Sequence, residues 1–146
     1  MDGIVERQRY DFDAVWSQAN LLYCRWAERL GLSYPVLMTL YALEVHGPMT
    51  QKGLADRYGF PKQTIHGVVH RLVKDGTVAL LPGETDRREK LVTLTGPGRE
   101  LVRTRLAPLF DAEREALSVI GQERIDRMLD TIGLFNLLMG RNLQEA

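Results

Sequence analysis

The chain has 146 residues, of which 45% are hydrophobic and 26% charged, a size and composition that suit one globular domain and exclude a disordered or collagen-like chain. Nineteen basic residues balance nineteen acidic ones, and a net charge of zero, taken alone, argues against a strongly basic nucleic-acid binder. No apolar run approaches the roughly 20 residues of a membrane span and the first residues lack a signal-peptide pattern, so we expect a cytoplasmic protein.

Metal-ligating side chains are scarce. A single cysteine, Cys24, excludes an intrachain disulfide and metal sites built on cysteine pairs. His66 and His70 have the spacing of two ligands on one helix face, but a zinc site needs a third ligand, for which Glu84 or Asp86 would be the candidates. DNA contact or solvent exposure suits the two histidines better, so we predict no metal and no cofactor.

Four helices are expected in the first half of the chain, because apolar residues recur there every three or four positions. Glycines end these segments, while Ser33, Thr50 and Pro61 are suited to helix starts. The four predicted helices run from Phe12 to Leu30, from Ser33 to Gly47, from Thr50 to Gly59 and from Pro61 to Gly76.

The apolar period changes after Gly76. Residues 77–81 and 90–94 read as two short strands, and the turn-rich, charged segment between them predicts a hairpin with a long polar tip. A fifth helix is expected from Thr95 to Ile120 and a sixth from Gln122 onward. The predicted fold class is therefore mainly α with a small β-hairpin.

Two helices joined across a glycine and followed by a hairpin have the order of a winged helix-turn-helix, here assigned to residues 33–95. The flanking helices, residues 10–31 and 96–142, are additional to that unit within one predicted domain, 1–146. Residues 134–139 are apolar almost all round, so their surface must be covered, most simply by the same helix of a second copy. We therefore predict a homodimer held by the flanking helices.

The fourth helix has a polar face opposite its apolar stripe. Such a face is also what an ordinary surface helix presents, but the partner helix and the hairpin favour DNA recognition. Glutamine can pair with adenine, and lysine, threonine and imidazole groups can reach base edges or phosphates, while a glycine allows close approach of the backbone. The predicted DNA-binding residues on this helix are Lys62, Gln63, Thr64, His66, Gly67 and His70.

The predicted hairpin tip carries adjacent arginines, Arg87 and Arg88. A mixed charge run in a turn is usually solvated surface, but two arginines on a projecting loop can enter a minor groove, where the negative potential is strongest. Asp86 lies two residues before Arg88 and could orient its guanidinium. We therefore add Arg87 and Arg88 to the predicted DNA contacts, with Asp86 as the orienting residue.

Two motifs follow one another here: Asp-x-Arg at residues 86–88 and Leu-Thr-x-x-Gly at residues 94–98. With Leu54-Ala55 in the third helix and residues 71–76 at the end of the fourth, they give the stretch from Thr50 to Leu101 a resemblance to the multiple-antibiotic-resistance regulator (MarR) family of winged-helix repressors. The resemblance implies a dimer with recognition helices in major grooves, wings in the flanking minor grooves, and an effector pocket between the dimerisation helices and the DNA-binding lobe.

The effector that such a pocket would take is a small aromatic or amphipathic molecule. Four aromatic residues are candidates for lining the pocket, although each could equally be core packing: Trp16, Tyr23, Trp26 and Tyr41. Cys24 offers thiol-based redox sensing as an alternative, but peroxide-sensing members of the family place their cysteine near the start of the first helix, whereas Cys24 lies in its second half.

The predicted function is that of a DNA-binding transcriptional regulator, a repressor of a pseudo-palindromic operator that is relieved by the effector. The charge distribution agrees, since residues 51–105 contain 11 basic and 6 acidic residues, and the segments on either side are net acidic. The alternative is a winged-helix protein-interaction module without DNA binding. An enzyme is not expected, because the sequence has no nucleophile paired with a base and no phosphate-binding loop.

Overall fold

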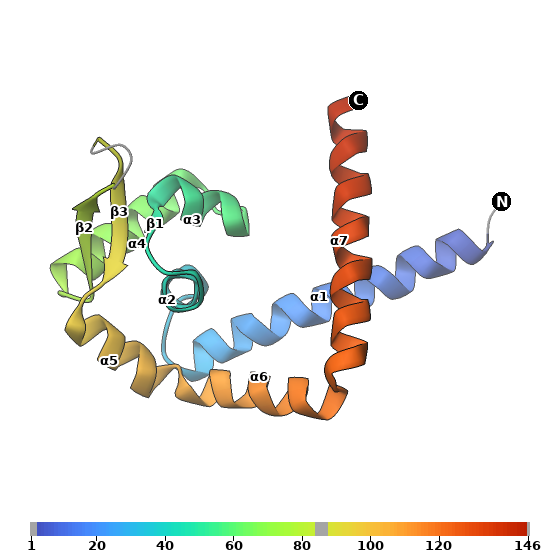
Figure 1. The fold of residues 1–146 in the computed structure, drawn as a ribbon, viewed down its shortest axis with the longest axis horizontal. Coiled ribbons are helices and arrows are strands. Elements are labelled where there is room, and N and C mark those ends of the chain that lie inside the picture. The colour runs from blue at the N-terminus through green and yellow to red at the C-terminus, as the bar shows by residue number, and fades with distance from the viewer. Residues whose placement is uncertain (1–2, 84–87, 146) are drawn as a thin grey trace. The chain divides into compact units, whose positions relative to one another are not determined.

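The computed structural model describes residues 3–83 and 88–145 and divides into two units, residues 1–107 and 108–146 (Figure 1). In the first unit the elements are α1 (Gly3–Arg29), α2 (Tyr34–His46), β1 (Met49–Thr50), α3 (Gln51–Tyr58), α4 (Lys62–Lys74), β2 (Val78–Pro82), β3 (Lys90–Leu94) and α5 (Gly96–Arg105). The second unit contains α6 (Ala107–Ile120) and α7 (Gln122–Glu145). The predicted fold class, mainly α with a β-hairpin wing, is confirmed.

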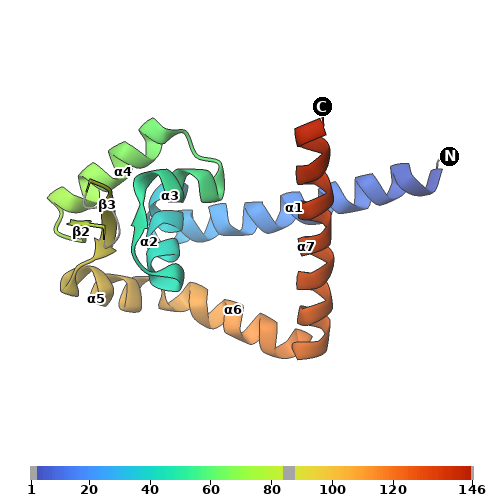
Figure 2. The same cartoon turned by 45° about the horizontal axis from the view of Figure 1, so that its top comes forward.

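The core of the first unit forms around α2, which lies against α1, α3, α4, α5 and β3 (Figure 2). Each of these elements except α1 contributes at least one large side chain that is less than 2% exposed. They are Leu37 and Leu40 of α2, Leu54 of α3, Ile65 and Val69 of α4, Val92 of β3 and Val102 of α5. The helix-turn-helix and the hairpin therefore share one apolar core that this unit closes by itself.

The sheet has three antiparallel strands in the order β1-β3-β2. The predicted hairpin is present, with Val78 opposite Leu94 and Pro82 opposite Lys90. The third strand, β1, was not predicted, because two residues are too short to show a strand period. It forms through pairing with β3, where Met49 lies opposite Val92.

Threonines begin two of the helices, as their sequence positions indicate. The Oγ1 of Thr50 accepts a bond from the N–H of Gly53 at 2.9 Å, and the Oγ1 of Thr95 accepts one from the N–H of Gly98 at 3.0 Å. Thr95 also ties α5 to the start of the hairpin, since its hydroxyl donates to the carbonyl of Gly76 at 2.6 Å. The Leu-Thr-x-x-Gly motif is thus a helix cap that also fastens the wing.

Two predicted helix boundaries are wrong. The first helix begins at Gly3, not Phe12, because the exposed residues 6–9, Glu-Arg-Gln-Arg, favour a helix but carry no apolar periodicity. The helix predicted from Thr95 to Ile120 is two helices, α5 and α6, with a break at Leu106. Pro108 explains the break, because a proline has no N–H for the carbonyl four residues earlier and its ring collides with that carbonyl.

The second unit has almost no buried apolar side chain. Eight large apolar residues in the described part of α7 are each at least 40% exposed: Met128, Leu129, Leu134, Phe135, Leu137, Leu138, Met139 and Leu143. In the N-terminal half of α1, Ile4, Tyr10, Val15 and Trp16 are exposed as well. Within the described ranges, no helix has the length and apolar character required to cross a membrane.

Candidate nucleic-acid interface

The helix α4 separates its apolar and polar side chains as predicted. Ile65, Val69 and Leu72 are buried, and α4 lies against α2 and α3. On the opposite side five of the six predicted contact residues are exposed, and the sixth, Thr64, is half-buried. The exposed ones are Lys62, Gln63, His66, Gly67 and His70. Since α4 contains no acidic residue, this face can approach a phosphate backbone without repulsion.

An aromatic cluster fixes the turn between α3 and α4. The ring of Phe60 lies edge-on to Tyr34, with 5.6 Å between centroids, and 6.1 Å from the ring of Tyr58. Partial burial raises the pKa of Tyr58 and of Tyr34 above the ordinary value of a phenol. Sequence reasoning did not find this cluster, because its members come from two helices and a turn.

The N-terminal ends of α3 and α4 meet at a small hollow of about 240 Å³, lined by Gln51, Lys52, Lys62 and His66. The Oε1 of Gln51 lies 3.3 Å from the Nδ1 of His66. With the amide of Gln51 in this orientation, its oxygen accepts, and the matching tautomer of a neutral His66 has the proton on Nδ1 and leaves Nε2 as an acceptor. Gln51 and Lys52 were not predicted, although the cap at Thr50 already places them in the first turn of α3.

Of the three predicted wing-tip residues, the structure describes only Arg88. The N–H of Gly83 donates to the carbonyl of Glu89 at 2.9 Å, which closes the hairpin beyond β2 and β3. Arg88 is exposed, whereas Asp86 and Arg87 lie outside the described residues. The orienting role of Asp86 therefore stays a prediction.

The four aromatic candidates for the effector pocket make different contacts within the single chain. Tyr23 and Tyr41 meet edge to face, with 6.1 Å between ring centroids. Trp26 instead lies beneath the guanidinium of Arg29, 5.3 Å away, and Trp16 stacks on Phe12 at 5.8 Å. Trp16 and Trp26 are ten residues apart on α1, which is roughly 15 Å along a helix. The assignment of these residues to an effector pocket stays a prediction.

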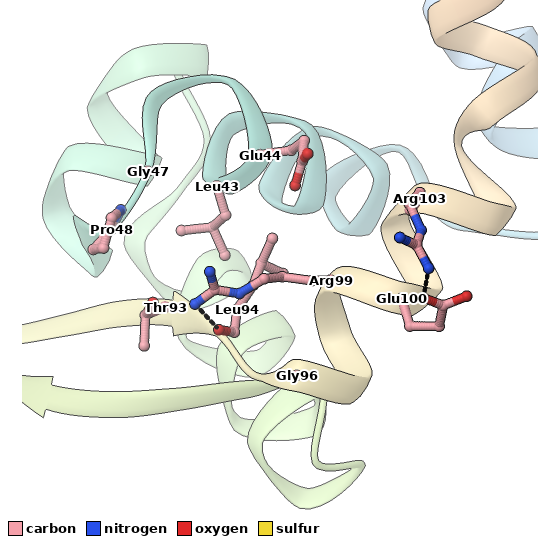
Figure 3. A pocket seen from close by; sticks show the side chains of 10 residues that line it. All are labelled: Leu43, Glu44, Gly47, Pro48, Thr93, Leu94, Gly96, Arg99, Glu100 and Arg103. Atoms are coloured by element: carbon pink, nitrogen blue, oxygen red, sulfur yellow. Dashed lines mark hydrogen bonds and ion pairs between the residues drawn. The ribbon is translucent and has the colours of Figure 1, made fainter.

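A larger hollow, of about 560 Å³, lies within the first unit between the end of α2 and the start of α5 (Figure 3). None of the four predicted aromatic residues lines it. Ten residues do: Leu43, Glu44, Gly47, Pro48, Thr93, Leu94, Gly96, Arg99, Glu100 and Arg103. Sequence reasoning missed this site, because its walls come from segments some 50 residues apart.

The redox-sensing alternative depends on Cys24, and a metal site would depend on converging ligand side chains. Cys24 is half-buried and forms no disulfide. Across the residues that the structure describes, no three histidine, cysteine or carboxylate side chains converge as a metal site would require.

Known proteins resemble this chain in both sequence and structure. The model of the MarR family matches residues 30–89. The transcriptional activatory protein BadR of Rhodopseudomonas palustris is 34% identical over 106 residues, which are 68% of this chain and 61% of that protein. The transcriptional repressor NicR of Pseudomonas putida is 40% identical over 65 residues, 44% of this chain and 41% of that protein. The matches thus span less than two thirds of these relatives' length.

A solved structure agrees over almost the whole chain. A MarR family regulator from Neisseria meningitidis superposes with a TM-score of 0.71 at 27% identity, covering 92% of this chain and 97% of that one. The chain therefore matches the MarR family in sequence over residues 30–89 and shares the winged helix-turn-helix fold of a solved MarR family regulator.

Proposed function

We propose that this protein is a sequence-specific DNA-binding transcriptional regulator that places α4 in the major groove and the β2–β3 hairpin at the adjacent minor groove. The observation that carries the proposal is the exposed, acid-free polar face of α4, extended by Lys52 of α3. Gln63 is suited to read an adenine, and Lys62 a guanine or a phosphate. Arg87 and Arg88 would enter the minor groove, with Asp86 orienting Arg88.

The DNA-binding form is a homodimer. The exposed apolar side chains of α7 and of the first half of α1 support this, because a soluble chain needs a partner for such surfaces. We assign residues 10–31 and 96–142 to dimerisation and residues 33–95 to the DNA-binding lobe. Two lobes would bind half-sites roughly 34 to 36 Å apart, one turn of DNA, which makes the operator pseudo-palindromic.

Regulation would act by repression that a small aromatic or amphipathic effector relieves. The two relatives carry opposite descriptions, activator and repressor, so a reporter gene under the operator must decide the sign. A cytoplasmic location follows from the same function, since the operator is genomic DNA. No enzymatic role is proposed.

The proposal is tested by fluorescence anisotropy on the DNA upstream of the protein's own gene, with scrambled DNA as competitor. Affinity should fall steeply as salt rises, because bound phosphates release their counterions. Gln63→Ala should weaken binding by ~1 to 3 kcal/mol and relax preference at one base pair. The matched control is Gln8→Ala, at an exposed position of α1 outside the residues assigned to dimerisation and DNA binding. Equal affinity for operator and scrambled DNA would contradict the proposal.

A further inference from the structure

The hollow between α2 and α5 has the size and shape of a small-molecule site. At about 560 Å³ it falls within the range of ligand pockets. The last turn of α2 forms one wall and the first two turns of α5 form the other, while the Gly47–Pro48 turn and the end of β3 close the remaining sides (Figure 3). Leu43, Pro48 and Leu94 supply an apolar surface within it.

Two charged groups border this hollow without an ionic partner. The guanidinium of Arg99 donates one N–H to the carbonyl of Leu94 at 3.3 Å and has no carboxylate partner among the described residues. Glu44, on the α2 wall, has neither a hydrogen bond nor an ion pair with any residue that the structure describes. By contrast, Arg103 is already paired with Glu100 on its own helix. The uncommitted charges are thus one cation and one anion on opposite walls.

This balance selects among ligand chemistries. A simple carboxylate would be attracted by Arg99 and repelled by Glu44, and a simple amine would meet the reverse. A molecule with both groups satisfies both walls, since guanidinium pairs well with carboxylate and carboxylate accepts from ammonium. We propose that the hollow binds a small zwitterion with an apolar body, an apolar amino acid by class, with its carboxylate on Arg99 and its ammonium on Glu44.

The position of the hollow connects it to the DNA-binding elements. Pro48 leads directly into β1 and Thr50, which caps α3, and Leu94 ends the strand that descends from the wing. A ligand that touches both would alter the spacing between the helix-turn-helix and the wing, and so the operator affinity. This regulatory consequence rests on the proposed function, whereas ligand binding itself does not.

The test uses isothermal titration calorimetry on the full chain without DNA. L-phenylalanine and L-leucine are the zwitterionic probes. Two analogues each lack one charged group of phenylalanine: 3-phenylpropanoate lacks the ammonium, and 2-phenylethylamine lacks the carboxylate. We expect at least one amino acid to bind, and phenylalanine to bind about tenfold more tightly than either truncated analogue, since each analogue loses one charged hydrogen bond. The proposal would be overturned if 3-phenylpropanoate bound as tightly as phenylalanine. It would also be overturned if neither amino acid bound.

Two variants assign the walls. Glu44→Gln should weaken phenylalanine binding about tenfold without weakening that of 3-phenylpropanoate, whereas Arg99→Gln should weaken both. Arg114→Gln, which breaks an exposed pair with Asp111 in α6, is the matched control and should change neither. Melting curves verify that all three variants fold. If both pocket variants bind phenylalanine as the wild type does, the assignment is wrong.

The two proposals fail separately. Specific amino-acid binding with no operator binding would reject the proposed function alone. Operator binding without amino-acid binding would reject the ligand site alone. When both occur, adding phenylalanine to the anisotropy assay should shift the operator dissociation constant, and a shift that persists in Arg99→Gln would remove the hollow from the regulation.

Discussion

The helices α4 and α7 place their apolar side chains in opposite environments. In α4 the apolar side is buried by elements of its own unit, and the polar side faces solvent. In the described part of α7 no apolar side chain is buried, and eight are largely exposed. The first unit thus has a buried apolar core, whereas the apolar side chains of α7 are exposed. In the proposed function, recognition by α4 and assembly through α7 are tasks of separate segments, and each can be broken without the other.

The largest effect is expected from a charge on α7. Leu138 is 43% exposed in the single chain, and Leu138→Glu would place a carboxylate in the proposed dimer interface twice, once from each copy. Burial of an unpaired charge costs several kcal/mol, so the dimer dissociation constant should rise at least about a hundredfold. Sedimentation analysis measures it. Gln144→Glu, on the same helix but outside the residues assigned to dimerisation, is the control with the same added charge. An unchanged dimer in Leu138→Glu would contradict the interface.

A second variant tests whether the lobe is closed by its own contacts. A Cβ on Gly98 would lie 1.9 Å from the carbonyl oxygen of Thr77, so Gly98→Ala must push α5 away from the start of the hairpin. We expect a loss of ~2 to 4 kcal/mol in the free energy of unfolding, measured by urea denaturation. Gly96→Ala is the matched control, because its Cβ would meet nothing within 4 Å. Similar stability in both variants would show that α5 can move freely.

The start of α5 shows which contacts could be predicted from the sequence alone. Thr95 was read as a helix cap, because a threonine before a helical period implies a bond within three residues, and the structure contains that bond. The close approach of Gly98 to Thr77 could not be predicted from the sequence, since it depends on how α5 packs beside the hairpin. The break near Leu106 could have been predicted from Pro108, whereas β1 could not, because two residues carry no period.

The site residues also fall into two groups, those that the helical period predicts and those that depend on tertiary packing. The exposed face of α4 followed from subtracting its apolar stripe, which needs only the helical period. The contributions of Gln51 and of the hollow around Arg99 required tertiary packing, because their partners are 15 to 55 residues away in the chain. The aromatic residues of α1 were grouped by type, and the structure separates Trp16 from Trp26 because residues ten apart occupy different turns.

The wing gives a third way to separate the two regions. Arg88→Ala should weaken operator binding by ~1 to 3 kcal/mol and lower the salt dependence by about one counterion, while the dimer stays intact. Anisotropy at several salt concentrations measures both quantities. Arg9→Ala, at an exposed position of α1 outside the residues assigned to dimerisation and to the DNA-binding lobe, removes the same charge and should leave both quantities unchanged. Loss of affinity with no change in salt dependence would mean that Arg88 does not contact the backbone or the groove.

The smallest effect sharpens the description of α4 itself. Because Gln51 accepts from the Nδ1 of His66, the Nε2 of the neutral ring faces out as an acceptor, which suits an exocyclic amine of cytosine or adenine. Gln51→Ala would free the ring to present either nitrogen, so operator affinity should fall by ~0.5 to 1 kcal/mol. In the background of His66→Ala, the same substitution should have no further effect.

The double-mutant cycle, measured by anisotropy on operators that differ at one base pair, separates this positioning role from a direct contact of Gln51 with DNA. A direct contact would give additive losses, whereas positioning makes Gln51 matter only while His66 is present.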